Sequence, residues 1–188
     1  HKQAHTIVKK EIVKKPTESI AKPDLSGTTG VTGVRDNNVE KTYENSGIRD
    51  VDFKNEVPTL TPNSTQEVPV TITYKDGSKE EDKVTLKVTP AAPIAPTVGQ
   101  WQNGNLKITP DKTNGGNQIE IPLVSGGNIV VKKGEDGNWT VEGEHPDVHV
   151  RDGVIEVPAD KVDNNVTVTA KVGEGELTNS TASEAYHK

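Results

Sequence analysis

Aspartate and asparagine side chains gathered in turns are the residues of this chain best suited to chemistry, and the chemistry they suit is calcium binding. Asp136 and Asn138 flank Gly137, and Asp163 precedes two asparagines. Calcium takes about six to eight oxygen ligands from carboxylates, amides, carbonyls and waters. Asp136, Asn138 and Asp163 are therefore candidate ligands of a structural calcium ion, the one cofactor that the residue types suggest.

The same residues have a second explanation. Further acidic groups lie at 50–52 and 76–82, and none of them forms the spaced D-x-[DN]-x-[DN]-G loop of a dedicated calcium site. Asp, Asn and Gly also form tight turns without any ligand. The sequence leaves both interpretations open.

Other patterns of catalytic or metal-binding residues are missing from the sequence. There is no cysteine, no Gly-x-Ser-x-Gly elbow and no Gly-rich phosphate loop. His145 and His149 lie around Pro146, where we expect strand or loop and solvated imidazoles rather than a zinc site. Carboxylates are numerous, but glycoside hydrolysis also needs an aromatic-lined cleft, and aromatic residues are 3% of the chain. We expect no enzymatic activity.

The two tryptophans, Trp101 and Trp139, have two candidate roles. Trp139 follows an Asp-Gly turn and begins a predicted strand, and Trp101 follows a proline-rich stretch, where we expect it to pack at a domain junction. Either ring could fill a core that has few other large side chains, or stack on a sugar. Core packing is the interpretation that we favour.

Composition and alternation predict an all-β protein that positions these residues. Hydrophobic residues are 30% of the 188 residues and are mainly β-branched, which favours half-buried strands. The clearest feature is a hairpin at 68–88, "VPVTITYKDGSKEEDKVTLKV", with a hydrophilic loop at Lys75–Asp82 that we expect to protrude. Other predicted strands are 39–43, 48–53, 106–108, 118–123, 128–132, 139–142, 148–151, 154–157 and 166–172.

The proline-rich stretch "TPAAPIAPT" at 89–97 is the strongest predicted boundary, because each proline removes a donor and stiffens the backbone. We expect an N-terminal linker or edge strand at 1–22, a β-module at 23–89, a semi-rigid spacer at 90–96 and a second β-module at 97–188. Since the sequence begins at His1 without Met, we expect a segment of a longer protein.

The hairpin at 68–88 resembles the closing hairpin of Rib/alpha-like repeats in Gram-positive surface proteins, although Lys75 replaces the usual Pro. The second half resembles the bacterial Ig-like modules of cell-wall-anchored adhesins, through "KKGEDGNWTV", "DGVIEVPADKV" and "NNVTVTAKV". These resemblances imply two tandem small β-sandwich modules, Rib-like and Ig-like, and they imply no reaction.

The expected function is a non-enzymatic stalk or spacer of a bacterial surface adhesin, anchored in the cell wall outside the cell, with neighbouring modules of the same protein as partners. The alternative is that one module binds a host glycan or a host extracellular-matrix protein. A net charge of −6 argues against nucleic acid. No apolar run is long enough for membrane insertion.

Overall fold

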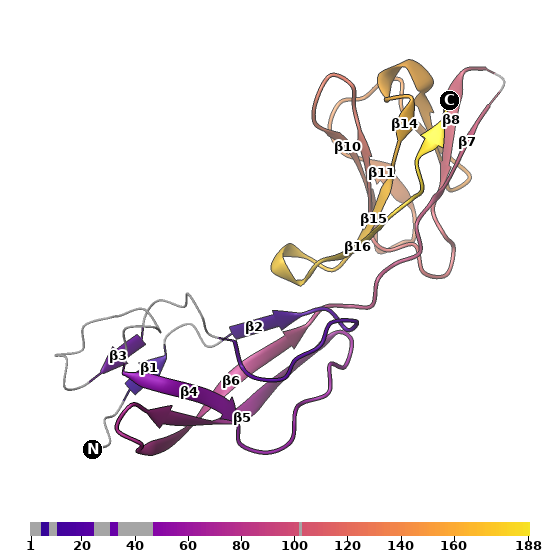
Figure 1. The fold of residues 1–188 in the computed structure, drawn as a ribbon. Helices are drawn as coiled ribbons and strands as arrows, with labels where there is room; N and C mark the ends of the chain where they lie inside the picture. Colours follow the sequence, from indigo (N-terminus) through magenta and orange to yellow (C-terminus); the bar gives the residue numbers. More distant parts are fainter. Residues whose placement is uncertain (1–4, 8–10, 25–30, 34–46, 102) are drawn as a thin grey trace. The chain divides into compact units, whose positions relative to one another are not determined.

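The protein is all-β and divides into two compact units. The computed structural model describes residues 5–7, 11–24, 31–33, 47–101 and 103–188. Unit 1 is His1–Thr89 and unit 2 is Pro90–Lys188. The described residues form strands and short 3-10 turns, with no α-helix (Figure 1). No helix in this part of the chain is long and apolar enough to cross a membrane.

Unit 1 is built on a four-stranded sheet of order β2-β6-β5-β4. The described strands of this unit are β1 (His5–Ile7), β2 (Glu11–Lys14), β3 (Val31–Gly33), β4 (Ile48–Phe53), β5 (Ser64–Tyr74) and β6 (Lys79–Val88). Neighbours in the sheet are antiparallel except β2 and β6, which run parallel. A separate antiparallel pair joins β1 to β3. The sequence therefore placed the hairpin and the strand at 48–53 correctly, and Glu11–Lys14 is an edge strand.

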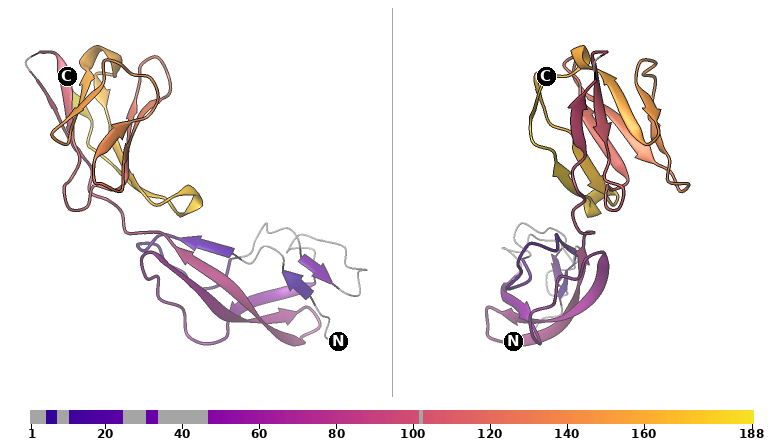
Figure 2. Two further views of the ribbon diagram at one scale, coloured as in Figure 1. Left: turned by 180° about the vertical axis from the view of Figure 1, so that it is seen from behind. Right: turned by 90° about the vertical axis from the view of Figure 1, so that its right-hand side faces the viewer.

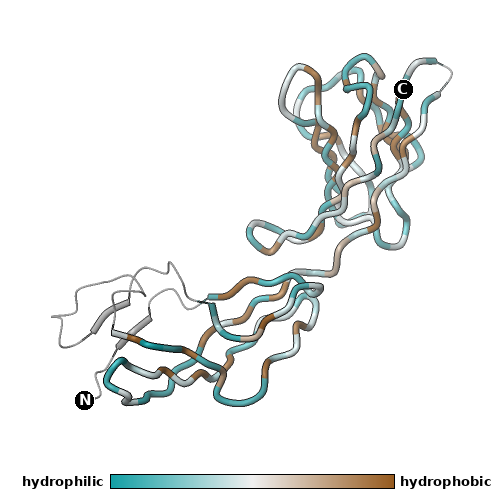
Figure 3. Tube along the Cα trace, viewed as in Figure 1, coloured by the Kyte–Doolittle hydropathy of each residue, from teal (hydrophilic) through white to brown (hydrophobic). Residues whose placement is uncertain are grey.

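Alternation along the hairpin creates the core of unit 1. Val70, Ile72 and Tyr74 on β5 are buried with Val84, Leu86 and Val88 on β6, and the residues that alternate with them along the strands are polar (Figure 3). Ile12, Ile48, Val51, Phe53 and Val68 complete this cluster.

The hairpin loop is shorter than the sequence indicated. Lys79 already pairs with Thr73, and Asp82 pairs with Val70, so Lys79–Asp82 belongs to β6 and the turn spans only 75–78. The prediction of a protruding loop at Lys75–Asp82 is wrong in its second half. Polar side chains continue a ladder when the partner strand offers free backbone groups, and β5 does. The predicted strand at 39–43 lies outside the described residues.

Unit 2 contains a five-stranded sheet, β11-β10-β9-β15-β16, and a four-stranded sheet, β12-β13-β8-β7 (Figures 1 and 2). All pairs are antiparallel, and β14 pairs separately with β17. The strands are β7 (Thr97–Gln100), β8 (Asn105–Thr109), β9 (Gln118–Pro122), β10 (Asn128–Lys133), β11 (Trp139–Val141), β12 (His149–Arg151), β13 (Val154–Pro158), β14 (Asn165–Val166), β15 (Thr169–Val172), β16 (Asn179–Ala182) and β17 (Tyr186–His187).

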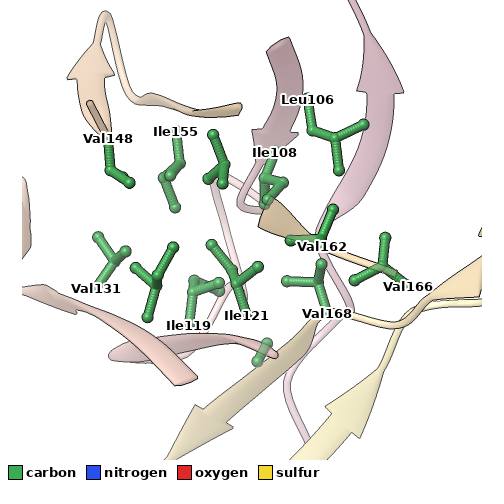
Figure 4. Packing of buried hydrophobic residues seen from close by; sticks show 13 residues of the cluster. Leu106, Ile108, Ile119, Ile121, Val131, Val148, Ile155, Val162, Val166 and Val168 are labelled. Carbon is green, nitrogen blue, oxygen red and sulfur yellow. The ribbon is translucent and has the colours of Figure 1, made fainter. Parts of the chain in front are cut away.

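Both sheets of unit 2 contribute to one core. Figure 4 shows its residues, which include Leu106 and Ile108 from β8, Ile119 and Ile121 from β9, and Ile155 from β13. These five side chains are fully buried.

The strands of unit 2 differ from the sequence prediction in two respects. The strand expected at 166–172 is divided into β14 and β15. A 3-10 turn at Ala159–Lys161, preceded by Pro158, lies between β13 and β14. The strands β7, β16 and β17 were not predicted, because they are short and lack hydrophobic alternation.

The proline-rich segment belongs to unit 2 and is bonded to it. Asn179 is buried, and its Nδ2 donates to the Pro90 carbonyl at 3.1 Å. The Ile94 N–H donates to the Asn114 carbonyl at 2.7 Å. Pro93 is also buried. What the sequence indicated as a separate spacer is attached along this unit.

Candidate functional site

Asp136 and Asn138 lie in the tight turn between β10 and β11. Asp136 Oδ1 accepts the Asn138 N–H at 3.0 Å, and Oδ2 accepts Asn138 Nδ2 at 3.1 Å. These bonds, the backbone one first, hold the pKa of the Asp136 carboxyl below its usual range. Gly137 has φ +84°, which suits glycine and closes the turn. Each residue therefore has a role in the turn that needs no ion.

Asp163 lies at the opposite end of β10. It follows the 3-10 turn at Ala159–Lys161, and the Val124 N–H donates to the Lys161 carbonyl at 2.9 Å, which places that turn beside the β9–β10 turn. The Asp136 turn follows the other end of β10, about 20 Å away for a strand of this length. Asp163 and Asp136 therefore do not converge on one ion.

The described residues contain no group of three or more His, Cys, Asp or Glu side chains placed to hold a metal ion. Neither acidic turn alone supplies the about six to eight oxygens that calcium takes. Calcium binding stays a prediction from residue types, without an assembled site in this part of the chain.

Trp139 begins the edge strand β11, opposite Lys133 on β10. Its ring is half-buried and packs against the core of unit 2, as the core-packing interpretation expected. The same residue also lines a surface hollow of about 330 Å³, which we call the Trp139 hollow. Trp139 is thus held by packing and borders a cavity as well.

Segments far apart in the sequence form the walls of the Trp139 hollow. The β8–β9 loop supplies Asp111 and Lys112, the β12–β13 turn supplies Asp152, and the β10 and β8 strands supply Lys133 and Lys107. None of these residues belongs to a functional motif in the sequence. The Asp136-Gly137 and Asp152-Gly153 pairs predict turns where strands end, but they do not predict which turns lie close together in the fold.

Asp111 keeps the β8–β9 loop in place. Its Oδ2 accepts the Asn114 N–H at 2.9 Å, the Thr113 N–H at 3.2 Å and the Thr113 hydroxyl at 3.0 Å. These bonds, with that of Asn114 first, hold the pKa of the Asp111 carboxyl below its ordinary value. A glycosidase needs an acid with a raised pKa, so the environment of Asp111 suits loop structure and ligand contact rather than proton donation.

Positive charge exceeds negative charge around the Trp139 hollow, where three lysines and two aspartates line the walls. Among the described residues, Lys107, Lys112 and Lys133 form no ion pair. Lys107 Nζ lies 5.9 Å from the centroid of the Trp101 ring, a cation–π distance. These three lysines are therefore available to a ligand.

Two other hollows of unit 2 differ in charge. One, of about 380 Å³, is lined by Lys132, Lys133 and Lys171. Lys132 pairs with Glu142 at 3.4 Å, and Lys171 pairs with Glu120, so most of its positive charge is neutralised. The other, beside Tyr186, has Glu184 as its one charged lining residue. The Trp139 hollow alone among these three combines an indole ring with unpaired lysines.

Trp101 lies at the turn of the β7–β8 hairpin. Its N–H donates to the Asn105 carbonyl at 2.8 Å, and its carbonyl accepts the Gly104 N–H at 3.2 Å. Trp101 therefore closes the β7–β8 hairpin, and the packing of this residue at the domain junction stays a prediction. The four residues of β7 separate Trp101 from Pro96 along the chain.

No protein-family model matches this chain, and no curated protein matches it at a meaningful level of similarity. The resemblances to Rib/alpha-like and bacterial Ig-like modules are therefore carried by the quoted motifs alone.

Proposed function

We propose that this chain is a non-enzymatic stalk segment of a bacterial surface adhesin, built from a Rib-like module and an Ig-like β-sandwich module, and that it resists mechanical tension. In this proposal the segment lies outside the cell on a Gram-positive cell wall. Its partners are the neighbouring modules of the same protein, and it holds a binding region away from the wall.

The observation that carries this proposal is the parallel pairing of β2 with β6. Tension along the chain enters the sheet of unit 1 at the amino end of β2 and leaves it at the carboxyl end of β6. Because the two strands are parallel, these opposite forces slide one strand along the other and load the pairs from Glu11–Thr85 to Lys14–Val88 together. Bonds that share a load resist it better than bonds that open one after another.

Two further contacts reinforce β2 against sliding. Ile12 is 6% exposed and packs in the core of unit 1. The Thr89 N–H donates to the Lys14 carbonyl at 2.9 Å, which extends the ladder beyond the end of β6. Glu11 pairs with Lys87 at 3.0 Å, and such a solvent-exposed pair adds only about 0–1 kcal/mol.

The connection between the units also supports a stalk. Thr89 is bonded to β2 within unit 1, and the Pro90 carbonyl accepts a hydrogen bond from Asn179 within unit 2. The connecting chain therefore has no free residue between the two anchored positions. A long flexible linker would first be stretched, with a loss of conformational entropy, before it transmitted force, whereas a short linker transmits the force directly.

Single-molecule force spectroscopy tests this proposal. The chain has no cysteine, so introduced cysteines define the points of attachment. Attachment at the two chain ends shears β2 against β6. Attachment at the amino end and at Lys75→Cys, in the exposed β5–β6 turn, pulls the same pairs apart from their amino ends. Unit 1 should unfold at clearly higher force in the first geometry than in the second.

Equal unfolding forces in the two geometries would contradict the stalk proposal, because the parallel pairs would then carry no special load. Forced unfolding depends on the rate of unfolding rather than on equilibrium stability. The two attachment variants are compared after their urea midpoints have been shown to agree, so that a difference in unfolding force reflects the pulling direction and not a change in stability.

A further inference from the structure

We propose that the Trp139 hollow binds an acidic sugar, a pyranose ring that carries a carboxylate. This binding function is additional to the stalk role and rests on unit 2 alone.

The Trp139 ring provides a rigid platform for a sugar ring. One side of the residue packs against the core that both sheets share, so the indole has little freedom to move away. Aromatic rings held in this way offer a large apolar face with a low entropic cost of binding. The hollow of about 330 Å³ lies at the small end of the range of ligand sites, about 300–1,000 Å³. It suits one short saccharide rather than a long polymer.

The charged residues around the ring favour a carboxylate. Lys107, Lys112 and Lys133 line the hollow with Asp111 and Asp152, three cationic against two anionic groups. The Asp111 carboxylate is already bonded to its own loop, whereas the three lysines form no ion pair among the described residues. In a chain of net charge −6, this is a local excess of positive charge.

A sugar satisfies the remaining groups better than other anions do. Asp152, at φ +51° in the exposed β12–β13 turn, offers a carboxylate that accepts hydrogen bonds from the several hydroxyl groups of a sugar, whereas sulfate and chloride carry no hydroxyl proton at neutral pH. Nucleic acid would meet the overall negative charge of the chain. A hydroxylated ring bearing one carboxylate matches the aromatic face, the lysines and the Asp152 acceptor together.

Two-dimensional NMR of the ¹⁵N-labelled full chain tests the site with three probes: 3′-sialyllactose, a glucuronate-containing hyaluronan disaccharide, and lactose. The two acidic sugars represent two sources of the same chemistry. At least one of them should shift the Trp139 indole N–H signal saturably, with a dissociation constant of about 1 mM or tighter. Lactose should bind at least about tenfold more weakly, because it lacks the charge-assisted bonds.

Variants locate the binding and separate it from folding. Lys112→Gln and Lys133→Gln change exposed side chains, and each should weaken acidic-sugar binding about tenfold without changing the urea midpoint. Lys132→Gln is the matched control, since the neighbouring Lys132 is paired with Glu142 and lines a different hollow; its affinity should not change. Trp139→Phe keeps an aromatic ring in the core and should also weaken binding, which is read in this variant from the backbone amide signals of the hollow because the indole signal is absent.

Three results would overturn the proposal: no saturable shift with either acidic sugar, shifts that map away from the Trp139 hollow, or equal binding of lactose. Loss of affinity in Lys132→Gln to the same extent as in Lys133→Gln would also overturn it, because the neighbouring hollow would then be the binding site. None of these results bears on the force measurements, so the stalk proposal stands or falls separately.

Discussion

Ile12→Ala tests how firmly the edge strand β2 is attached to unit 1. Ile12 is 6% exposed, and its register partner on β6 is Leu86, which is fully buried. It is the one buried hydrophobic residue among the described residues of β2. The substitution removes the apolar anchor of the strand and leaves the backbone pairing with β6 intact.

The expected loss of stability follows from the atoms removed. Ile→Ala deletes about three carbons, worth about 0.8 kcal/mol each when buried, and leaves a cavity that relaxes only in part. Buried Ile→Ala substitutions cost about 2–5 kcal/mol. An edge strand relaxes more easily than a central one, so we expect about 2–3 kcal/mol. At a urea dependence of about 1 kcal/mol per molar, the midpoint of unit 1 should fall by about 2 M.

The two units can be followed separately because both tryptophans, Trp101 and Trp139, lie in unit 2. Tryptophan fluorescence reports the unfolding of unit 2, and amide exchange along β5 and β6 reports unit 1. Ile12→Ala should shift the unit 1 transition, lower its unfolding force when the chain is pulled from its ends, and leave the fluorescence transition unchanged.

Val57→Ala is the matched control for Ile12→Ala. Val57 lies in the same unit and is 50% exposed, so its truncation should change stability by no more than about 0.5 kcal/mol. If Ile12→Ala costs no more than Val57→Ala, then β2 is not anchored through the core, and the mechanical argument loses its basis.

Three other predictions concern pH, turns and the proline segment. Burial and then the nearby carboxylates raise the pKa of Tyr74 above its ordinary value of about 10. The contribution of the protonated phenol to stability is therefore complete below pH 10 and is lost as pH rises beyond it. Tyr74→Phe should flatten the alkaline decline in the stability of unit 1, and an unchanged decline would refute the assignment. Gly116→Ala should destabilise unit 2 by more than Gly104→Ala in urea titrations followed by fluorescence. Both glycines have a positive φ, but of the two only Gly116 would have its added Cβ overlap a backbone carbonyl. Equal losses of stability would show that φ strain alone matters. Asn179→Asp replaces a buried amide donor by a carboxylate facing a carbonyl and should cost about 1–3 kcal/mol, with faster exchange of the Ile94 amide as the specific readout.

Local sequence patterns predicted most individual strands because alternation and turns are short-range properties. The Val70–Ile72–Tyr74 alternation located β5, and Asp136-Gly137 located the β10–β11 turn. The same patterns failed for Lys79–Asp82, where a polar run continues β6 because its backbone groups pair with β5. They also failed for β16, whose residues are polar or small and whose place is fixed by pairing with β15.

The candidate site was much less predictable. Trp139 was recognised as a residue with two candidate roles, and the structure gives it both a core contact and a place at the edge of a hollow. Lys107 and Lys112 had no distinguishing signal, and Asp152-Gly153 predicted only a turn, because loops and strands that are distant along the chain bring these residues together. The calcium candidates were chosen by residue type alone, and the structure places Asp136 and Asn138 after one end of β10 and Asp163 near the other.

The sequence by itself determined that this protein is all-β and acidic, with a boundary at its proline-rich stretch, because composition, alternation and proline act within a few residues. Only the tertiary structure decided that β2 runs parallel to β6, that the proline segment is bonded to unit 2, and that unpaired lysines surround Trp139. Each of these features depends on contacts between residues far apart in the chain, and loop closure and packing, rather than local preference, determine which of those contacts form.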